Sequence, residues 1–442
     1  MFRRSIAAAL LCLCLSSAAA AAGAGAGAPP SVPAVDAPAL AALGPWAIGV
    51  ESLTLTQSGQ PNVLAYHAVA KTMPTGDRVL PVDIWYPALK RTGARPVVYA
   101  GALSGEDRKD VAFTSPGIAV REAPVAPGRF PIVILAHGYG GTPVAMTWLA
   151  ENLASKGYVV VGPHFRDPPY GDGSASAGPL ARRPLDIAFV ATQAQARARA
   201  GRGGLASADP GRVALIGYSM GGYGVLTAAG ATLQPALADA THGALAPFVA
   251  GASRAAELKV DGVKAVVAIS PAGLFGGREA WGASGLAHVT APTLIIVGSQ
   301  DHVVGYNPGV RTLWSQAVSA PRYLLTFLEG GHSIGMNPAP DTMRGRLWDQ
   351  DWFEDPVWRK ERVIGVQLHL ITAFLDRYVK GDAAMAAYLD VAKAWSDDGV
   401  WPAKAGGSWA GVSPGAPEAT LWKGFQRGHA VGLTLEFAPP AP

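Results

Sequence analysis

The chain has 442 residues, of which 49% are hydrophobic, enough to bury a full core in one large domain with extensions. Its formal net charge of +4 falls to +2 without Arg3 and Arg4, which excludes the strongly basic surface of a nucleic-acid-binding or membrane-surface-binding protein. Both cysteines, Cys12 and Cys14, lie near the N-terminus. The rest of the chain therefore has no disulfide, no thiol nucleophile and no cysteine-based metal site.

The N-terminus has the pattern of a secretory signal peptide. Arg3 and Arg4 precede the apolar residues 6–15 and an alanine-rich stretch, so we expect cleavage between residues 20 and 28. The apolar stretch is too short for a membrane span. The pattern predicts export to the periplasm or the medium and leaves the Sec and twin-arginine routes open. Residues 1–28 are taken as signal peptide and start of a flexible tether, which composition extends over 23–44.

The elements alternate along the chain. Apolar runs predict strands, and amphipathic segments predict helices between them. The predicted strands are 79–87, 130–136, 158–162, 213–216, 265–269, 293–297 and 323–328, and the predicted helices are 145–156, 184–199, 223–229 and 360–379. This alternation predicts an α/β fold with a mostly parallel central sheet and helices on both faces.

Three regions complete the predicted domain organisation. A single α/β domain is expected over residues 45–382, with a segment at 232–260 that could form a lid. Residues 383–442 carry four tryptophans and are expected to pack on the domain as a C-terminal extension.

A serine lies between glycines in the stretch 217–222, directly after an apolar strand and before a helix-forming segment. Strand, G-x-S-x-G and helix in this order are typical of a nucleophile elbow. The glycines are needed because side chains at the flanking positions would collide with the strand and the helix. The pattern predicts Ser219 as a nucleophile.

The same pattern occurs twice more. At 411–415, Pro414 follows the serine and removes the N–H that would stabilise an oxyanion. At 331–335, Pro338 and Pro340 prevent the helix that should follow. Only Ser219 has the required context.

A serine nucleophile needs a base and an acid that orients the base. Asp301 follows the strand predicted at 293–297, and His332 follows the strand predicted at 323–328. Because this is the chain order Ser…Asp…His of strand-end triads, we predict Asp301 as the acid and His332 as the base. Asp186 is the alternative acid.

The other histidines fit the base less well. His302 follows the wrong strand, His369 lies within a predicted amphipathic helix, and His137 opens a glycine-rich loop that it is expected to stabilise.

The oxyanion hole needs two backbone donors. Met220 N–H follows the nucleophile, and Tyr139 N–H lies in the loop after the strand 130–136. Four aromatic residues follow His332 closely in the chain: Trp348, Trp352, Phe353 and Trp358. We expect them either to wall an apolar pocket or to anchor their segment on the body.

Together these residues resemble the α/β-hydrolase superfamily: the loop His137-Gly138-Tyr139-Gly140-Gly141, the elbow around Ser219, Asp301 and His332. More narrowly, the stretches 82–87, 183–186 and 374–382 resemble the bacterial predicted dienelactone hydrolases, a group that overlaps in sequence with platelet-activating-factor acetylhydrolases. The likeness spans residues 50–430. True dienelactone hydrolases use a cysteine nucleophile, whereas this chain has Ser219.

The predicted function is that of an exported serine hydrolase that cleaves small-molecule carboxylic esters through an acyl-enzyme, without cofactor or metal. Two alternatives stay open: a peptidase or amidase on the same fold, and a non-catalytic binding protein of the cell envelope. The sequence does not indicate an oligomeric state.

Overall fold

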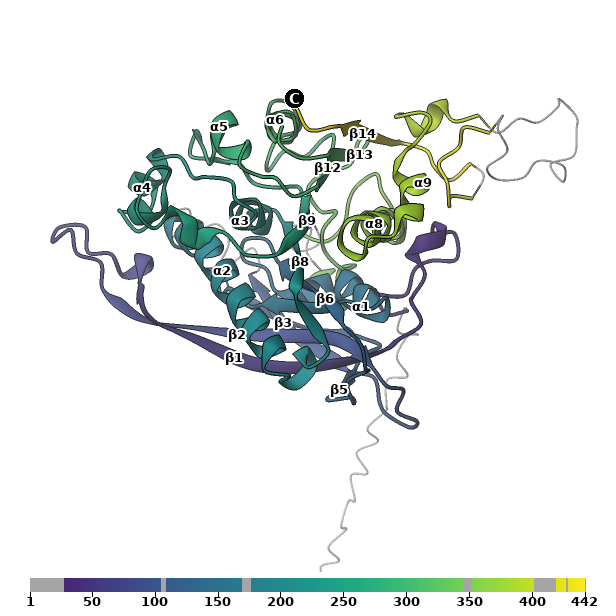
Figure 1. Ribbon diagram of the computed structural model, residues 1–442, viewed down its shortest axis with the longest axis horizontal. Coiled ribbons are helices and arrows are strands. Elements are labelled where there is room, and N and C mark those ends of the chain that lie inside the picture. The colour runs from purple at the N-terminus through teal and green to yellow at the C-terminus, as the bar shows by residue number, and fades with distance from the viewer. Residues whose placement is uncertain are drawn as a thin grey trace, which may run out of the picture.

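The computed structural model describes residues 28–104, 109–168, 176–345, 351–400, 419–426 and 428–441. A ten-stranded sheet runs through the centre in the order β14-β13-β12-β9-β8-β6-β7-β2-β1-β5 (Figure 1). Its strands are β1 (Ala47–Pro61), β2 (Thr75–Ala88), β5 (Val120–Arg121), β6 (Phe130–Ala136), β7 (Val159–Pro163), β8 (Ala208–Tyr218), β9 (Val263–Ile269), β12 (Thr293–Gly298), β13 (Arg322–Phe327) and β14 (Leu433–Ala438). This architecture confirms the predicted α/β-hydrolase fold class.

The centre of the sheet is parallel. Six strands from β7 to β13 run in one direction, and their continuous apolar runs are buried on both faces, as parallel strands require. The outer strands β2, β1 and β14 are antiparallel to their inner neighbours. Two small hairpins lie outside this sheet: β3 (Val98–Ser104) with β4 (Asp110–Pro116), and β10 (Leu274–Phe275) with β11 (Arg278–Glu279).

Helices cover both faces of the sheet, as Figure 1 shows with α1 and α8 on one side and α2 and α3 on the other. Each face has its own apolar core. The α-helices are α1 (Thr147–Ser155), α2 (Ala177–Arg199), α3 (Met220–Ala228), α4 (Ala236–Ala240), α5 (Gly282–Leu286), α6 (Arg311–Gln316), α8 (Lys360–Leu375) and α9 (Ala386–Leu389). Within the described ranges, no helix combines the length and apolar character that crossing a membrane requires.

Helix α2 starts earlier than the sequence predicted, because Pro184 lies inside it rather than at its start. A proline has no N–H to give to the carbonyl four residues before it. The hydroxyl of Tyr223 on α3 donates to that carbonyl, Leu180 O, at 3.2 Å. The packing of α3 against α2 thus satisfies the group that the proline leaves open. At the other end of the chain, the predicted helix 360–379 ends as α8 at Leu375 and continues as a π-helical turn, Asp376–Lys380.

The segment from residue 28 to β1 was expected to belong to a flexible tether, and this is wrong for its described part. Ser31 Oγ donates to Glu151 Oε2 at 2.6 Å, and Leu40 N–H donates to His369 Nδ1 at 3.1 Å. Asn152 Nδ2 donates to Ala41 O at 2.9 Å. Composition alone suggested a linker, but these polar contacts with buried side chains of α1 and α8 fix the segment on the body.

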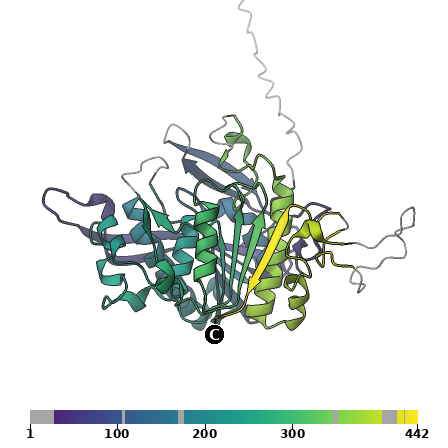
Figure 2. The same cartoon turned by 90° about the horizontal axis from the view of Figure 1, so that it is seen from above.

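The C-terminal extension contributes a strand to the sheet. Strand β14 pairs with β13 along its whole length and forms the edge of the sheet, as Figure 2 shows in yellow. Trp422 is buried and donates through Nε1 to Lys393 O at 2.8 Å. Trp401 and Trp409 lie outside the described residues.

Candidate active site

The nucleophile elbow has the predicted context of strand, turn and helix. Ser219 lies between β8 and α3 with φ 55° and ψ −117°, a strained conformation for a residue with a side chain. A Cβ on Gly217 would lie 2.2 Å from Gly221 O, and one on Gly221 would lie 2.1 Å from Ala136 O. The two flanking positions can therefore only be glycine, because the turn packs directly on its own helix and on β6.

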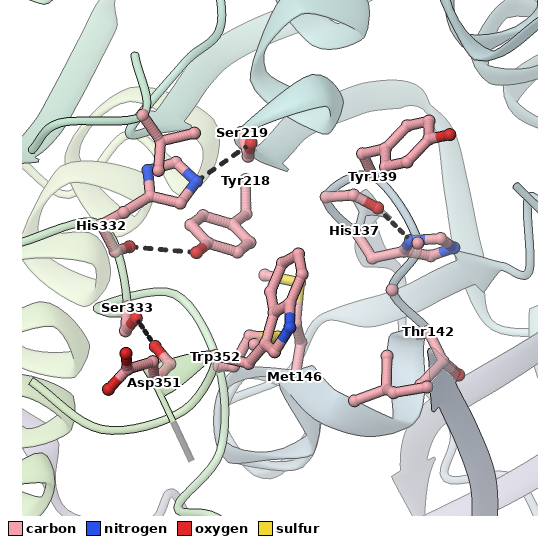
Figure 3. Close-up of a pocket in the computed structure, with 16 residues that line it drawn as sticks. His137, Tyr139, Thr142, Met146, Tyr218, Ser219, His332, Ser333, Asp351 and Trp352 are labelled. Atoms are coloured by element: carbon pink, nitrogen blue, oxygen red, sulfur yellow. Dashed lines mark hydrogen bonds between the residues drawn. The ribbon is translucent and has the colours of Figure 1, made fainter. Parts of the chain in front are cut away.

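Ser219, His332 and Asp301 meet at the carboxyl ends of β8, β13 and β12. His332 Nε2 lies 3.1 Å from Ser219 Oγ, and His332 Nδ1 lies 2.8 Å from Asp301 Oδ2 (Figure 3 shows the serine contact). The ionised carboxylate accepts a hydrogen bond from Nδ1–H, so that Nε2 presents its lone pair to the serine hydroxyl. The three residues thus have the hydrogen-bond connectivity of a Ser-His-Asp triad.

The electrostatics keep Asp301 ionised. Burial alone would raise the pKa of Asp301, but the hydrogen bond and charge of His332 and the N–H of Val304 outweigh burial and lower this pKa. Its other oxygen, Oδ1, accepts from Val303 N–H at 3.0 Å and from Val304 N–H at 3.1 Å. Both oxygens of the carboxylate are therefore used, and its orientation is fixed.

The loop that carries His332 is held in place by hydrogen bonds from surrounding side chains to its backbone carbonyl groups. Each carbonyl of residues 332–335 accepts a hydrogen bond from a side chain of β8, α8 or α1. The pairs are Tyr218 Oη to His332 O, Lys360 Nζ to Ser333 O, Gln367 Nε2 to Ile334 O and Trp148 Nε1 to Gly335 O. Burial lowers the pKa of Lys360 to about 8, against the opposing charges of Glu354 and Asp355. These donors come from three elements, so the histidine is positioned by the body of the protein.

On the opposite side of the cavity lies the loop after β6, with His137 and Tyr139 (Figure 3). His137 is buried; its Nδ1 donates to Gly138 O at 2.7 Å, and its Nε2 accepts from Phe165 N–H at 3.1 Å. Burial, followed by the charge of Arg183, lowers the pKa of His137 well below 6.5. His137 is therefore neutral, with both nitrogens engaged in holding backbone.

Tyr139 and Met220, the predicted oxyanion donors, come from the loop after β6 and from the start of α3. Tyr139 lines the same cavity as Ser219, and Met220 is the first residue of α3. Their role as donors stays a prediction.

A cavity of about 200 Å³ opens beside Ser219. Its walls beyond the triad and the loop 137–142 are largely apolar, and they come from segments far apart in the sequence. The lining outside that loop includes Leu103, Met146, Tyr218, Val303, Met336, Asp351 and Trp352. In the described part of the chain, the predicted lid segment 232–260 contributes no residue to this lining.

The predicted aromatic cluster divides between two positions. Trp352 lines the cavity. Phe353 is buried in the core, and Trp358 donates through Nε1 to Leu328 O at 2.7 Å, so these two anchor the segment. Trp348 lies outside the described residues. Leu103, Met146 and Met336 were missed, because no motif connects the β3–β4 hairpin, the turn before α1 or the residues after His332 to the cavity.

The alternative candidates for the acid, the base and the nucleophile make other contacts. Asp186 is buried, and Arg78 and Arg182 surround its carboxylate. His369 bridges Leu40 N–H and Lys423 O, and burial lowers its pKa to about 3. Ser333 Oγ donates to Asp351 O, and no helix follows directly after Ser333. The third G-x-S-x-G, at 411–415, lies outside the described residues. Within the described ranges, no three histidine, cysteine, aspartate or glutamate residues gather as metal ligands would.

The order of the strands and the position of the site at the carboxyl ends of the parallel strands are those of the α/β-hydrolase fold. Residues 118–322 match the model of the dienelactone hydrolase family, which confirms the resemblance predicted from the sequence; the match includes Ser219 and Asp301 and ends before His332. A ferulic acid esterase from Streptomyces cinnamoneus has a similar structure, with a TM-score of 0.47 and 19% identity over 76% of this chain and 91% of that chain. No curated protein sequence matches the chain.

Proposed function

We propose that the protein is an exported serine hydrolase that cleaves small, uncharged carboxylic esters through an acyl-enzyme. The observation that carries the proposal is the hydrogen-bonded series Ser219–His332–Asp301 at the mouth of an apolar cavity. The match to the dienelactone hydrolase family supports hydrolysis as the reaction class.

In the proposed mechanism, Ser219 Oγ attacks the ester carbonyl while His332 Nε2 takes its proton. The N–H groups of Tyr139 and Met220 stabilise the oxyanion. His332 then returns the proton to the leaving alcohol, and the acyl group stays on Ser219. Water, deprotonated by His332, attacks the acyl-enzyme and releases the acid. Asp301 remains ionised throughout and stabilises the imidazolium.

The cavity suggests the substrate size. Its apolar walls favour an acyl or alcohol group without charge, and its volume of about 200 Å³ limits that group to short or medium length. Each buried methylene adds about 0.8 kcal/mol until the wall is reached. Ser219 stands where true dienelactone hydrolases have cysteine, so the family name does not make lactones the expected substrate.

The experiment is a series of p-nitrophenyl esters from acetyl to palmitoyl, run beside aminoacyl-anilides, with Ser219→Ala as control. We expect kcat/KM to rise and then fall, with its maximum at or below about octanoyl, as for a bounded pocket. Faster cleavage of the anilides would favour a peptidase. A steady rise to palmitoyl, with a jump at an emulsified interface, would indicate a lipase.

A further inference from the structure

A buried ion pair lies directly behind the loop that carries Tyr139. Arg183 lies on α2, and Asp167 follows β7. Arg183 Nη2 is 2.5 Å from Asp167 Oδ2, and the two side chains are 0% and 3% exposed. Asp167 Oδ2 also accepts from Gly140 N–H at 3.1 Å, and Arg183 Nη1 donates to His137 O at 3.2 Å. The pair therefore contacts the backbone on both sides of Tyr139.

Through Phe165, Arg183 is also connected to the side chain of His137 at the start of this loop. The Arg183 guanidinium lies 3.8 Å from the centre of the Phe165 ring, and Phe165 N–H donates to His137 Nε2. Space for Arg183 comes from the helix of the elbow, because a Cβ on Gly224 would lie 2.6 Å from Arg183 Cγ. The arginine thus touches α3, the loop after β7 and the loop after β6.

A buried ion pair contributes little net stability, because the cost of desolvating both charges offsets their attraction. The backbone groups that this pair contacts indicate its role. One guanidinium and one carboxylate fix a carbonyl and an N–H of a glycine-rich loop, whose glycines give it no stiffness of its own. Catalysis needs that stiffness, since an oxyanion donor acts only if it is aimed in advance.

We propose that Arg183 and Asp167 are positioning residues for the oxyanion hole, which hold residues 137–140 so that Tyr139 N–H faces the oxyanion. This inference rests on the proposed function of the site. It also gives a role to Arg183 in the stretch 183–186, which carried part of the family resemblance.

Arg182 provides a matched control on the same helix. It is also buried, and it pairs with the fully buried Asp186. Its remaining contacts are with Gln57 and Gln60 of β1. Removing Arg182 therefore breaks a buried ion pair of α2, as removal of Arg183 does, without touching the loop after β6.

The test compares Arg183→Gln with Arg182→Gln by kcat, KM, thermal stability and rate of labelling by a fluorophosphonate. In labelling, Ser219 Oγ bonds to phosphorus, fluoride leaves, and His332 takes the proton. Misaimed donors weaken transition-state binding more than substrate binding. We expect Arg183→Gln to lower kcat and the labelling rate by about 10 to 10² fold with KM changed less than about threefold. Arg182→Gln should retain both rates.

A second pair of variants guards against misfolding of the arginine variant. Asp167→Asn keeps an oxygen for Gly140 N–H, whereas Asp167→Ala does not, so asparagine should retain clearly more of the labelling rate than alanine. Equal labelling rates in wild type and Arg183→Gln, equal losses in the Arg183 and Arg182 variants, or equal losses in the two Asp167 variants would overturn the inference. Absence of labelling in the wild type would instead overturn the proposed function.

Discussion

Replacing Asp301 by asparagine should prevent His332 from acting as the base without disturbing the fold. Oδ1 of Asp301 accepts two N–H groups, from Val303 and Val304. The asparagine must keep its carbonyl oxygen there, because the flipped amide would leave both N–H groups unpaired at about 1–3 kcal/mol each. Its NH2 group then faces His332 Nδ1, which lies 2.8 Å from the carboxylate in the native protein.

An NH2 group in that position selects the wrong tautomer of His332. Nδ1 becomes the acceptor, Nε2 carries the hydrogen, and Nε2 can no longer take the proton of Ser219. We expect kcat at saturating ester to fall by on the order of 10³–10⁴, equivalent to about 4–5.5 kcal/mol in the activation free energy.

The assay is steady-state hydrolysis of the best p-nitrophenyl ester, with thermal unfolding measured on the same samples. Asp186→Asn is the control, since Asp186 is a buried carboxylate engaged by Arg78 and Arg182. A loss below about tenfold for Asp301→Asn, or an equal loss for Asp186→Asn at unchanged stability, would refute the assignment of the acid.

Three further predictions concern the pocket, the pH dependence of stability and export. Trp352→Ala should enlarge the cavity and move the acyl-chain optimum to longer esters; an unchanged optimum would contradict its place in the wall. The folded-state pKa of His369 is about 3, against 6.5 when unfolded. Its contribution to stability is therefore present above pH 6.5 and is lost as the pH falls toward 3, at up to about 1.4 kcal/mol per pH unit. Urea unfolding of His369→Gln should show a shallower decline with falling pH than the wild type, and equal slopes would exclude this histidine as a cause. N-terminal sequencing of exported protein should begin between residues 20 and 30, and a chain that starts at Met1 in the cytosol would contradict export.

The central strands could be predicted because strands buried on both faces must be apolar throughout. Strand β6 has the predicted bounds, and β9, β12 and β13 differ by one or two residues at their ends. The outer strands β1 and β14 could not be predicted in this way. Most of β1 alternates between exposed and partly buried positions, and β14 is a short strand within a C-terminal extension.

Nearness of the triad residues could be predicted because they follow parallel strands, whose carboxyl ends meet at one edge of the sheet. The contacts that hold the elements around the site could not be predicted, because they join segments that are distant in the sequence. Pro184 suggested a helix start, yet the Tyr223 hydroxyl allows it inside α2. Leu103 reaches the cavity from a hairpin, and residues 28–41 looked like a linker until the buried Glu151 and His369 provided partners.

The most direct test of the proposed function is the site of covalent labelling. Wild-type protein is treated with a fluorophosphonate, digested and analysed by mass spectrometry, beside Ser219→Ala. The triad geometry predicts one rapid adduct, on Ser219, and no adduct in the variant. An adduct on Ser333 of the competing G-x-S-x-G, or labelling that persists in Ser219→Ala, would contradict the assignment of the nucleophile.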